Sequence, residues 1–196
     1  MGQVAIIGWG SLVWDLDDLA PHVSGSWRME EGPMLPLEFT RISPKRKNGL
    51  AVCIDETFGT PCPTHIIASA RADCTEAILD LAKRERTEPQ NIGALCRRTG
   101  IRKAVSARIM GTIDAWAKSK GWSCAVWTDI GSNFEAELGE PFSVPRGLAY
   151  LGSLTGESRR EAIRYIAQAP SATDTPLRRA LAEEPWWREE ASRFNP

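Results

Sequence analysis

Short apolar stretches separated by turn-forming residues occupy the first third of the chain. Residues 3–8 (QVAIIG) form an apolar run closed by Gly-Trp-Gly, which predicts a buried strand leading into a tight loop. Apolar residues alternate with others over residues 35–40, the period of a half-buried strand. Two further apolar runs, at residues 50–54 and 65–70, flank a segment rich in Gly and Pro and predict two more strands. The basic turn at residues 43–49 is expected to be the solvated end of a hairpin.

Helical periodicity begins near residue 73. Asp73 and Glu76 have the spacing of a capping box, and the residues after them predict a helix that runs through residue 86. A second amphipathic stretch covers residues 103–120, with Val105 among the apolar residues of one face. Both stretches are long enough to cover a sheet with their apolar faces.

The last third of the chain is predicted to be mainly helical. A strand at residues 124–130 comes first. Ser158 and Glu161 then have the spacing of a second capping box. Thr175 precedes Pro176, which is typical of a cap residue followed by proline in the first helical turn.

This order of elements bears on the fold class. Strands and helices do not alternate regularly, which argues against a doubly wound parallel sheet. We expect an α+β fold, with a small mixed or antiparallel, barrel-like sheet and surrounding helices. No repeat or low-complexity linker interrupts the chain, so we expect one domain over residues 1–196, with a helical C-terminal extension from about residue 145.

Composition excludes several kinds of partner. The 196 residues include 24 Lys and Arg against 25 Asp and Glu, a formal net charge of −1. Binding to nucleic acid through bulk phosphate attraction, or to a membrane through a polybasic surface, is therefore not expected. Eight Trp against two Tyr is an unusual aromatic balance, and Trp lines pockets as readily as cores.

The five cysteines form no C-x-x-C pair, and their number is odd. We expect small buried thiols rather than a metal site or a disulfide framework. The first residues lack the basic region and cleavage site of a signal peptide, and no apolar run approaches the ~20 residues that span a bilayer. A cytoplasmic location is the expectation.

The loop after the first predicted strand is the first candidate site. Gly8 and Gly10 let the backbone turn sharply and bring amide N–H groups close to an anionic ligand. The simpler interpretation is a turn that merely needs glycine. A dinucleotide-binding loop would have a third glycine where Val13 stands, so a nucleotide site rests on Gly8-x-Gly10 alone.

Glu85 is the second candidate. On a helix it falls on the same stripe as Ile78 and Leu81, whereas Lys83 and Arg84 are expected to point elsewhere. A carboxylate on an apolar stripe is costly unless it is paired or used, and such a group suits general acid or base chemistry. The alternative is that the helix has ended and Glu85 is solvated or paired with an arginine.

Other polar and aromatic residues are weaker candidates. His22 and His65 have no partner at the spacing of a metal site or a catalytic triad. Trp127 and Asn133 follow the late strand and are candidates to line a pocket. The pair Trp186–Trp187 is expected to dock onto the body of the protein or to form a dimer contact.

Together, the two main candidates resemble the γ-glutamylcyclotransferase-like superfamily. Trp9-Gly10-Ser11-Leu12 is similar to the Tyr-Gly-Ser-Leu loop of that superfamily, and residues 13–15 look like the run that follows it in the ChaC-type branch. Residues 81–85 (LAKRE) are similar to the Leu-x-x-Arg-Glu segment of the branch, and Gly93 is similar to a later glycine. The resemblance covers about residues 3–130.

The resemblance implies an enzyme that cyclises a γ-glutamyl compound to 5-oxoproline and releases an amine or amino acid. Glu85 would be the general base, and Trp9, Gly10, Ser11 and Leu12 would hold the substrate. No cofactor and no metal are implied, because the α-amine of the substrate is itself the nucleophile.

Three points stay open. Trp9 stands where the superfamily has Tyr, so the phenol oxygen is missing, and Glu88 competes with Glu85 as the base. A non-catalytic protein of the same fold that binds a small anionic metabolite is the alternative function. An enzyme that binds a nucleotide through Gly8-x-Gly10 is a further one.

Overall fold

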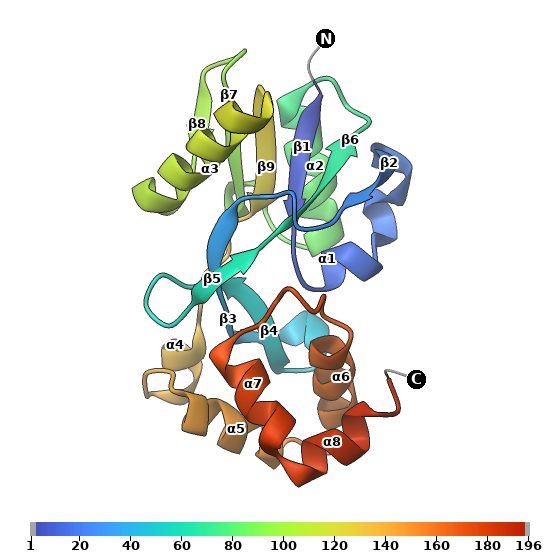
Figure 1. Cartoon of the computed structure of the whole chain (residues 1–196), viewed down its shortest axis with the longest axis vertical. Helices are drawn as coiled ribbons and strands as arrows, with labels where there is room; N and C mark the ends of the chain where they lie inside the picture. The colour runs from blue at the N-terminus through green and yellow to red at the C-terminus, as the bar shows by residue number, and fades with distance from the viewer. Residues whose placement is uncertain (1–2, 195–196) are drawn as a thin grey trace. The chain divides into compact units, whose positions relative to one another are not determined.

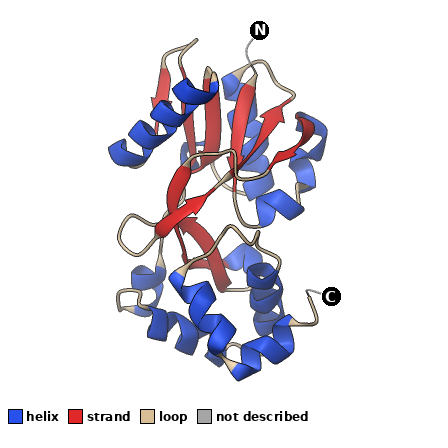
Figure 2. Ribbon diagram, viewed as in Figure 1, coloured by secondary structure: helices blue, strands red, loops and turns tan. Residues whose placement is uncertain are grey.

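The computed structural model describes residues 3–194, which form two compact units (Figures 1 and 2). Of the described residues, the first unit comprises 3–35 and 63–130, and the second comprises 36–62 and 131–194. The organisation of the chain as a single domain stays a prediction. None of the helices within residues 3–194 is both long and apolar enough to cross a bilayer.

The first unit is built on a six-stranded mixed sheet with the strand order β2-β6-β1-β9-β7-β8 (Figure 1). Strand β1 pairs antiparallel with β6 on one side and parallel with β9 on the other, with Ile6 opposite Ile67 and Val126. Every residue of β1 is buried, which explains its continuous apolar run. The strands are β1 (Val4–Gly8), β2 (Val23–Arg28), β6 (His65–Ser69), β7 (Ile92–Cys96), β8 (Ile101–Lys103) and β9 (Cys124–Thr128).

Two long helices lie on opposite sides of this sheet, α3 in front of it and α2 behind it in Figure 1. Alternate strand residues such as Val4, Ile6 and Val126 share a core cluster with Ala77 and Leu81 of α2. The helices of the unit are α1 (Ser11–Trp14), α2 (Cys74–Glu85) and α3 (Ala107–Lys120), and short 3₁₀ turns cover Asp17–His22 (η1) and Pro89–Asn91 (η3).

A three-stranded sheet and five helices make up the rest of the described chain. The strand order is β4-β3-β5, and β3 and β4 form an antiparallel hairpin in which Ile42 lies opposite Leu50. The strands are β3 (Met34–Ser43), β4 (Gly49–Ile54) and β5 (Thr60–Pro63), with the 3₁₀ turn η2 (Pro44–Arg46) between β3 and β4. The helices are α4 (Phe134–Leu138), α5 (Val144–Ser153), α6 (Gly156–Ala167), α7 (Pro176–Glu183) and α8 (Pro185–Ala191).

The α+β class is therefore confirmed, but the barrel is not. Within residues 3–194 the strands form two open sheets, because the end strands β2 and β8 of the larger sheet do not pair with each other. Four strands were not predicted from the sequence: β2, β5, β7 and β8. The prediction of helices toward the C-terminus agrees with α5–α8.

Helix starts were predicted correctly where the cap residue is followed directly by the helix. The carboxylate of Asp73 accepts hydrogen bonds from the amides of Thr75 and Glu76, and Thr175 caps α7. The other two starts were wrong. Helix α3 begins at Ala107 after the cap Ser106, so Val105 precedes the helix and is 83% exposed. Helix α6 begins at Gly156, which leaves the second capping-box motif inside the helix.

The basic turn after β3 was also predicted wrongly in part. It does join a hairpin, but Arg46 is buried rather than solvated. Its guanidinium lies 3.0 Å from Glu161 of α6 and 4.9 Å from the ring centre of Tyr165. A charged residue in a turn thus ties the hairpin to α6.

The cysteines correct a further prediction. Cys96 of β7 and Cys124 of β9 form a disulfide, although free thiols were expected throughout. The two residues are 28 positions apart in sequence and become neighbours only through the β7–β9 pairing. The remaining cysteines, Cys53, Cys62 and Cys74, are free and buried.

Candidate functional site

Both glycines of the loop after β1 have a structural reason. A Cβ on Gly8 would lie 2.5 Å from the ring of Trp27, so a larger residue does not fit there. Gly10 has φ 56°, a left-handed conformation that favours glycine, and it is the N-cap residue of α1. The Gly8-x-Gly10 spacing is thus accounted for by packing and backbone conformation.

The four predicted substrate-binding residues lie at the start of α1. Trp9, Ser11 and Leu12 are all buried, and Leu12 packs into the core cluster between the sheet and α2. The side chain of Leu12 is therefore structural. The first N–H groups of a helix have no acceptor within the helix itself.

Helix α2 brings an unexpected residue to the same place. Its buried stripe runs through Ala77 and Leu81 to Arg84, whose side chain is only 1% exposed. The expectation that Arg84 points away from the core is wrong, because Arg84 follows Leu81 by three positions and Ala77 by seven, and both spacings return to one face. The helix ends at Glu85, and Arg86 adopts the left-handed conformation that closes it.

Arg84 joins the two sequence candidates. One guanidinium nitrogen, Nη2, donates to the hydroxyl of Ser11 at 3.3 Å and to the backbone carbonyl of Asp15 at 2.5 Å. The other, Nη1, donates to Oε1 of Glu85 at 2.7 Å. The loop after β1 and the end of α2 are therefore held together through a single buried cation.

Two surface ion pairs connect the same segments. Lys83 lies 3.8 Å from Asp18, and Arg86 lies 3.5 Å from Asp17. Exposed pairs of this kind contribute ~0–1 kcal/mol each, so the buried contacts of Arg84 dominate the connection. The segment that carries the predicted loop is thus fastened to the last turn of α2.

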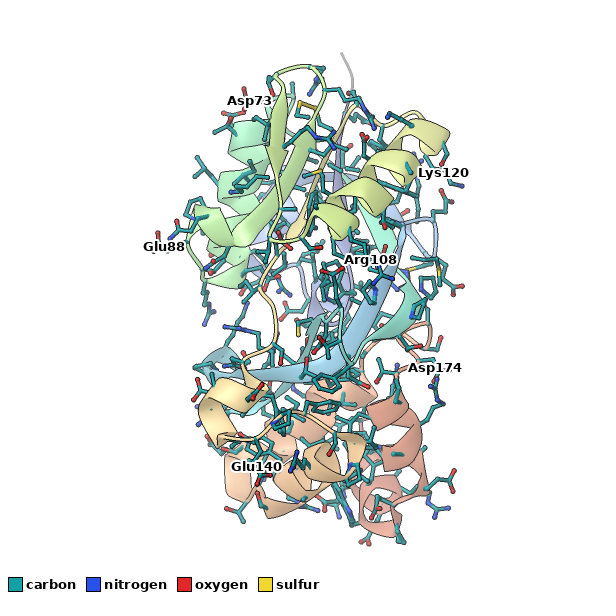
Figure 3. All side chains as sticks on the ribbon, turned by 90° about the vertical axis from the view of Figure 1, so that its left-hand side faces the viewer. Asp73, Glu88, Arg108, Lys120, Glu140 and Asp174 are labelled. Atoms are coloured by element: carbon teal, nitrogen blue, oxygen red, sulfur yellow. A yellow bond between two sulfur atoms is a disulfide. The ribbon has the colours of Figure 1, made fainter. Side chains whose placement is uncertain are left out.

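The two candidate bases differ in their surroundings. The side chain of Glu85 is 17% exposed, whereas Glu88 is an exposed residue beyond the end of α2 (Figure 3). Of the two interpretations of Glu85, the structure shows the pairing with an arginine, on a half-buried carboxylate. Arg84 donates to Oε1 of Glu85, and the second carboxylate oxygen, Oε2, has no hydrogen bond to Arg84 among the described contacts. Arg84 and Asp15 were missed by the sequence analysis.

Other predicted residues have structural roles. Gly93 of β7 lies opposite Trp127 of β9, and a Cβ on Gly93 would lie 2.1 Å from the indole ring. Trp127 is fully buried. In the second unit, the side chain of Asn133 accepts a hydrogen bond from the backbone N–H of Ile42 and donates one to its carbonyl. Asn133 thus continues the edge of a strand.

The two histidines also form structural contacts. His65 is fully buried, and its Nδ1 accepts a hydrogen bond from the backbone N–H of Glu30. Burial lowers the pKa of His65, so the ring is held in its neutral form. His22 contacts Asp80 of α2 at 3.7 Å and Arg71 at 3.1 Å, in a polar group at the surface.

The second unit has a cavity of its own, with a volume of about 210 Å³. Its lining includes Arg159 and Arg160 of α6 and Glu190 of α8. Arg159 is already paired with Glu190 at 2.6 Å and stacks over Trp186, which agrees with docking onto the body of the protein, one of the two alternatives for this pair. The dimer contact stays a prediction. The cavity contains none of the predicted site residues.

Comparison of the chain with models of protein families, with curated proteins and with solved structures finds no match. The candidate site therefore rests on the contacts of Ser11, Asp15, Arg84 and Glu85.

Proposed function

We propose that this protein is a γ-glutamylcyclotransferase-type enzyme that converts a γ-glutamyl compound to 5-oxoproline. The observation that carries the proposal is the set of contacts of Arg84, which places the Ser11 segment and the Glu85 carboxylate around one buried guanidinium. These are the two segments in which the sequence resembles the superfamily. We assign the fold of that superfamily to the first unit, whose mixed sheet supports both segments.

In the proposed reaction the substrate provides its own nucleophile. Glu85 accepts a proton from the α-ammonium group, and the free amine attacks the γ-carbonyl carbon. The new N–C bond closes the five-membered ring, the attacking nitrogen gives up a second proton, and the C–N bond to the leaving group breaks. The leaving nitrogen takes up both protons, one of them from Glu85, and departs as an ammonium group, which leaves 5-oxoproline and the Glu85 carboxylate. No oxidant, reductant or metal takes part in this balance.

The backbone N–H groups at the start of α1 are suited to the oxygen of the attacked carbonyl, which gains negative charge in the transition state. Arg84 has a positioning role in this scheme. It orients one oxygen of Glu85 and ties it to the segment that would bind the substrate.

The free cysteines support a reaction without a protein nucleophile. Burial raises the pKa of Cys53 to about 12 and that of Cys62 to about 11, so neither thiol ionises near neutral pH. Burial also raises the pKa of Cys74. A substrate that cyclises on its own amine needs no such group.

A panel of γ-glutamyl compounds tests the proposal, with 5-oxoproline and released amine measured together. Glutathione, γ-glutamyl amino acids and γ-glutamylamines form the panel. We expect both products in equal amounts from at least one of them. We also expect product release to be about 10²–10⁴-fold slower in Glu85→Gln and unchanged in Glu88→Gln, because Glu88 is exposed and outside the site.

One observation favours a second function, the binding of a small anionic metabolite without catalysis. The Glu85 carboxylate is already paired with Arg84, and Trp9 replaces the tyrosine of the superfamily in a buried position. A non-catalytic protein would bind members of the panel, seen as a rise in the melting temperature, and release no 5-oxoproline. A cytoplasmic location and the possible homodimer stay predictions of the sequence.

A further inference from the structure

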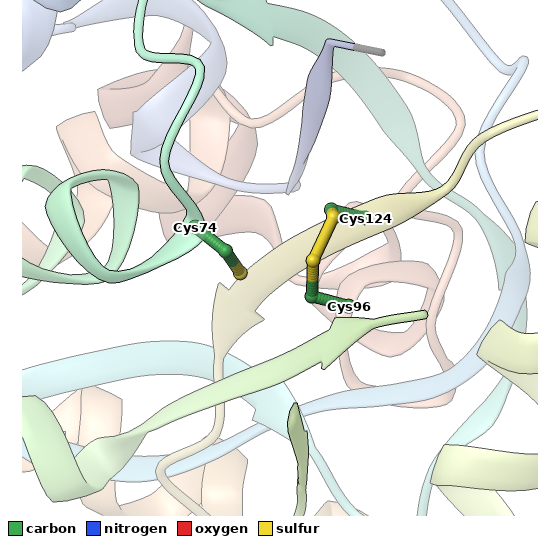
Figure 4. Close-up of side chains that lie close together, drawn as sticks. All are labelled: Cys74, Cys96 and Cys124. Carbon is green, nitrogen blue, oxygen red and sulfur yellow. A yellow bond between two sulfur atoms is a disulfide. The ribbon is translucent and has the colours of Figure 1, made fainter. Parts of the chain in front are cut away.

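Three cysteine sulfurs meet at the end of α2 opposite to the candidate site (Figure 4). Cys74 is the first residue of α2, Cys96 is the last of β7, and Cys124 is the first of β9. All three Sγ atoms lie within 4.8 Å of one another, and each residue is at most 2% exposed. We call this group the cysteine cluster.

Three separate elements hold the cluster in place. Cys96 and Cys124 are directly opposite in the antiparallel β7–β9 pair, so their side chains share one face of the sheet. Cys74 is fixed by the start of α2, where the Asp73 carboxylate caps the helix. The sulfurs converge because α2 packs on that same face.

The surroundings of the cluster restrict what it can bind. The three cysteines belong to the apolar core cluster, together with Val4 and Ala77. A net charge buried in such a place is costly, so a complex of three thiolates is favoured when the bound ion carries three positive charges. The near-complete burial also leaves no solvent to complete the four-ligand shell that zinc prefers.

We propose that the cysteine cluster, once its disulfide is reduced, binds one trivalent thiophilic ion of the arsenic(III) type through three sulfur–ion bonds. Sulfurs about 2.3 Å from one ion lie about 3.4–4.0 Å apart. The three Sγ atoms lie within 4.8 Å of one another, and reduction of the disulfide allows those of Cys96 and Cys124 to separate to this spacing.

The chemistry of the site balances without a change in the oxidation state of the ion. A phosphine, with one water molecule, first converts the Cys96–Cys124 disulfide to two thiols and is itself oxidised to the phosphine oxide. Arsenous acid, As(OH)₃, then exchanges its three hydroxyl groups for the three thiols, and three water molecules leave. The product is neutral, as the apolar surroundings require.

The disulfide controls access to this site. In the oxidised protein two of the three sulfurs are bonded to each other, and only Cys74 remains as a thiol. One thiol forms a single exchangeable bond to arsenic, so the oxidised protein is expected to release the ion on dilution. Binding is therefore restricted to the reduced state.

Intact mass spectrometry of the full chain tests the proposal, with arsenite as the probe. The protein is compared before and after reduction by a phosphine, which is removed before arsenite is added. We expect the reduced protein to gain one arsenic and lose three hydrogens, and the oxidised protein to remain unchanged. A gain of one arsenic and one hydroxyl with the loss of two hydrogens would mean that only two sulfurs bind, and would overturn the three-sulfur site.

Variants assign the sulfurs. Cys74→Ser should weaken arsenite binding by more than ~100-fold, since even changes around metal ligands cost about 10–100-fold. Cys53→Ser, which removes a buried thiol of the second unit, should leave it unchanged. If Cys74→Ser does not fold, the mass change of the reduced wild-type protein still distinguishes binding by three sulfurs from binding by two. Equal binding by Cys74→Ser, or loss in Cys53→Ser, would contradict the proposal. No γ-glutamyl substrate is involved, so this outcome is independent of the proposed activity.

Discussion

Two adjacent residues at the end of α2 have opposite charges and different surroundings. Arg84 is buried among Ser11, Asp15 and Glu85, whereas the Glu85 carboxylate is half-buried. The sequence predicted a functional role for Glu85 because this residue lies four positions after Leu81, on the apolar stripe of the helix. It did not predict the burial of Arg84, because a buried guanidinium is favourable only when partners from another segment are present.

Replacing Arg84 tests this difference directly. Arg84→Ala leaves the Glu85 carboxylate without its partner and should lower the free energy of unfolding by about 3 kcal/mol. The matched control is Arg86→Ala, since the Arg86 side chain is exposed and its ion pair contributes ~0–1 kcal/mol. Urea unfolding measures both variants, and equal effects would show that Arg84 does not hold the site together.

A pair of glycines tests the packing beside the sheet. Gly93→Ala places a methyl group 2.1 Å from the buried Trp127 ring and should destabilise the protein by about 1–3 kcal/mol. Gly111→Ala lies within α3, where the new methyl group meets nothing within 4 Å, and should stabilise by about 0.5–1 kcal/mol. Thermal unfolding of the two variants should shift in opposite directions. If Gly93→Ala leaves the stability unchanged, close packing against Trp127 is not the reason for glycine at position 93.

Among the elements, those with local signals were the ones that the sequence could predict. Helix α2 has a cap and an apolar stripe within twelve residues, and β1 is a continuous apolar run. The missed strands β7 and β8 are five and three residues long, and their partners lie elsewhere in the chain. The disulfide was missed for the same reason, because it needs the β7–β9 pairing. The Ser11–Arg84 contact is equally non-local.

The cap of α3 allows a test within one helix. Ser106 accepts a hydrogen bond from the backbone N–H of Ile109, so Ser106→Ala should lower the free energy of unfolding by about 1 kcal/mol. Ser119, near the other end of α3, is exposed and donates to the carbonyl of Trp116. Ser119→Ala should change stability by less than ~0.5 kcal/mol. Chemical denaturation compares the two, and a larger effect at position 119 would contradict the assigned start of α3.

At the scale of the molecule, a buried carboxylate makes stability depend on pH. Glu38 is fully buried in the second unit, and burial raises its pKa above the ordinary value of 4.5 despite hydrogen bonds from Thr175, Phe39 and Leu177. The folded protein holds the proton of the Glu38 carboxyl more tightly than the unfolded chain does. The protonated carboxyl therefore stabilises the folded state, and this stabilisation is complete below pH 4.5. It is lost as the pH rises through the folded pKa.

The corresponding variant is Glu38→Gln, which cannot ionise. The wild type loses stability as Glu38 ionises, whereas the variant does not. The free energy of unfolding of the variant minus that of the wild type should therefore increase as the pH rises from 4.5 toward 7. Urea unfolding at a series of pH values measures the difference between the two proteins. A difference that does not change with pH would show that Glu38 has the same pKa in the folded and unfolded states.

The charge balance of the whole chain agrees with the proposed chemistry without identifying the substrate. A net charge of −1 provides no broad field, so a small zwitterionic substrate would be held by local groups such as the N–H groups at the start of α1. The choice among γ-glutamyl compounds depends on the residues around the leaving group. The excess of tryptophan does not identify them, since Trp9, Trp127 and Trp187 are buried in packing positions.

The most direct test of the central claim is the rate of 5-oxoproline release by Glu85→Gln beside Glu88→Gln, on the best substrate of the panel. We expect Glu85→Gln to lower kcat by about 10²–10⁴-fold, the usual contribution of a general base, and Glu88→Gln to keep the wild-type rate. Near-wild-type release by a folded Glu85→Gln variant would contradict the central claim.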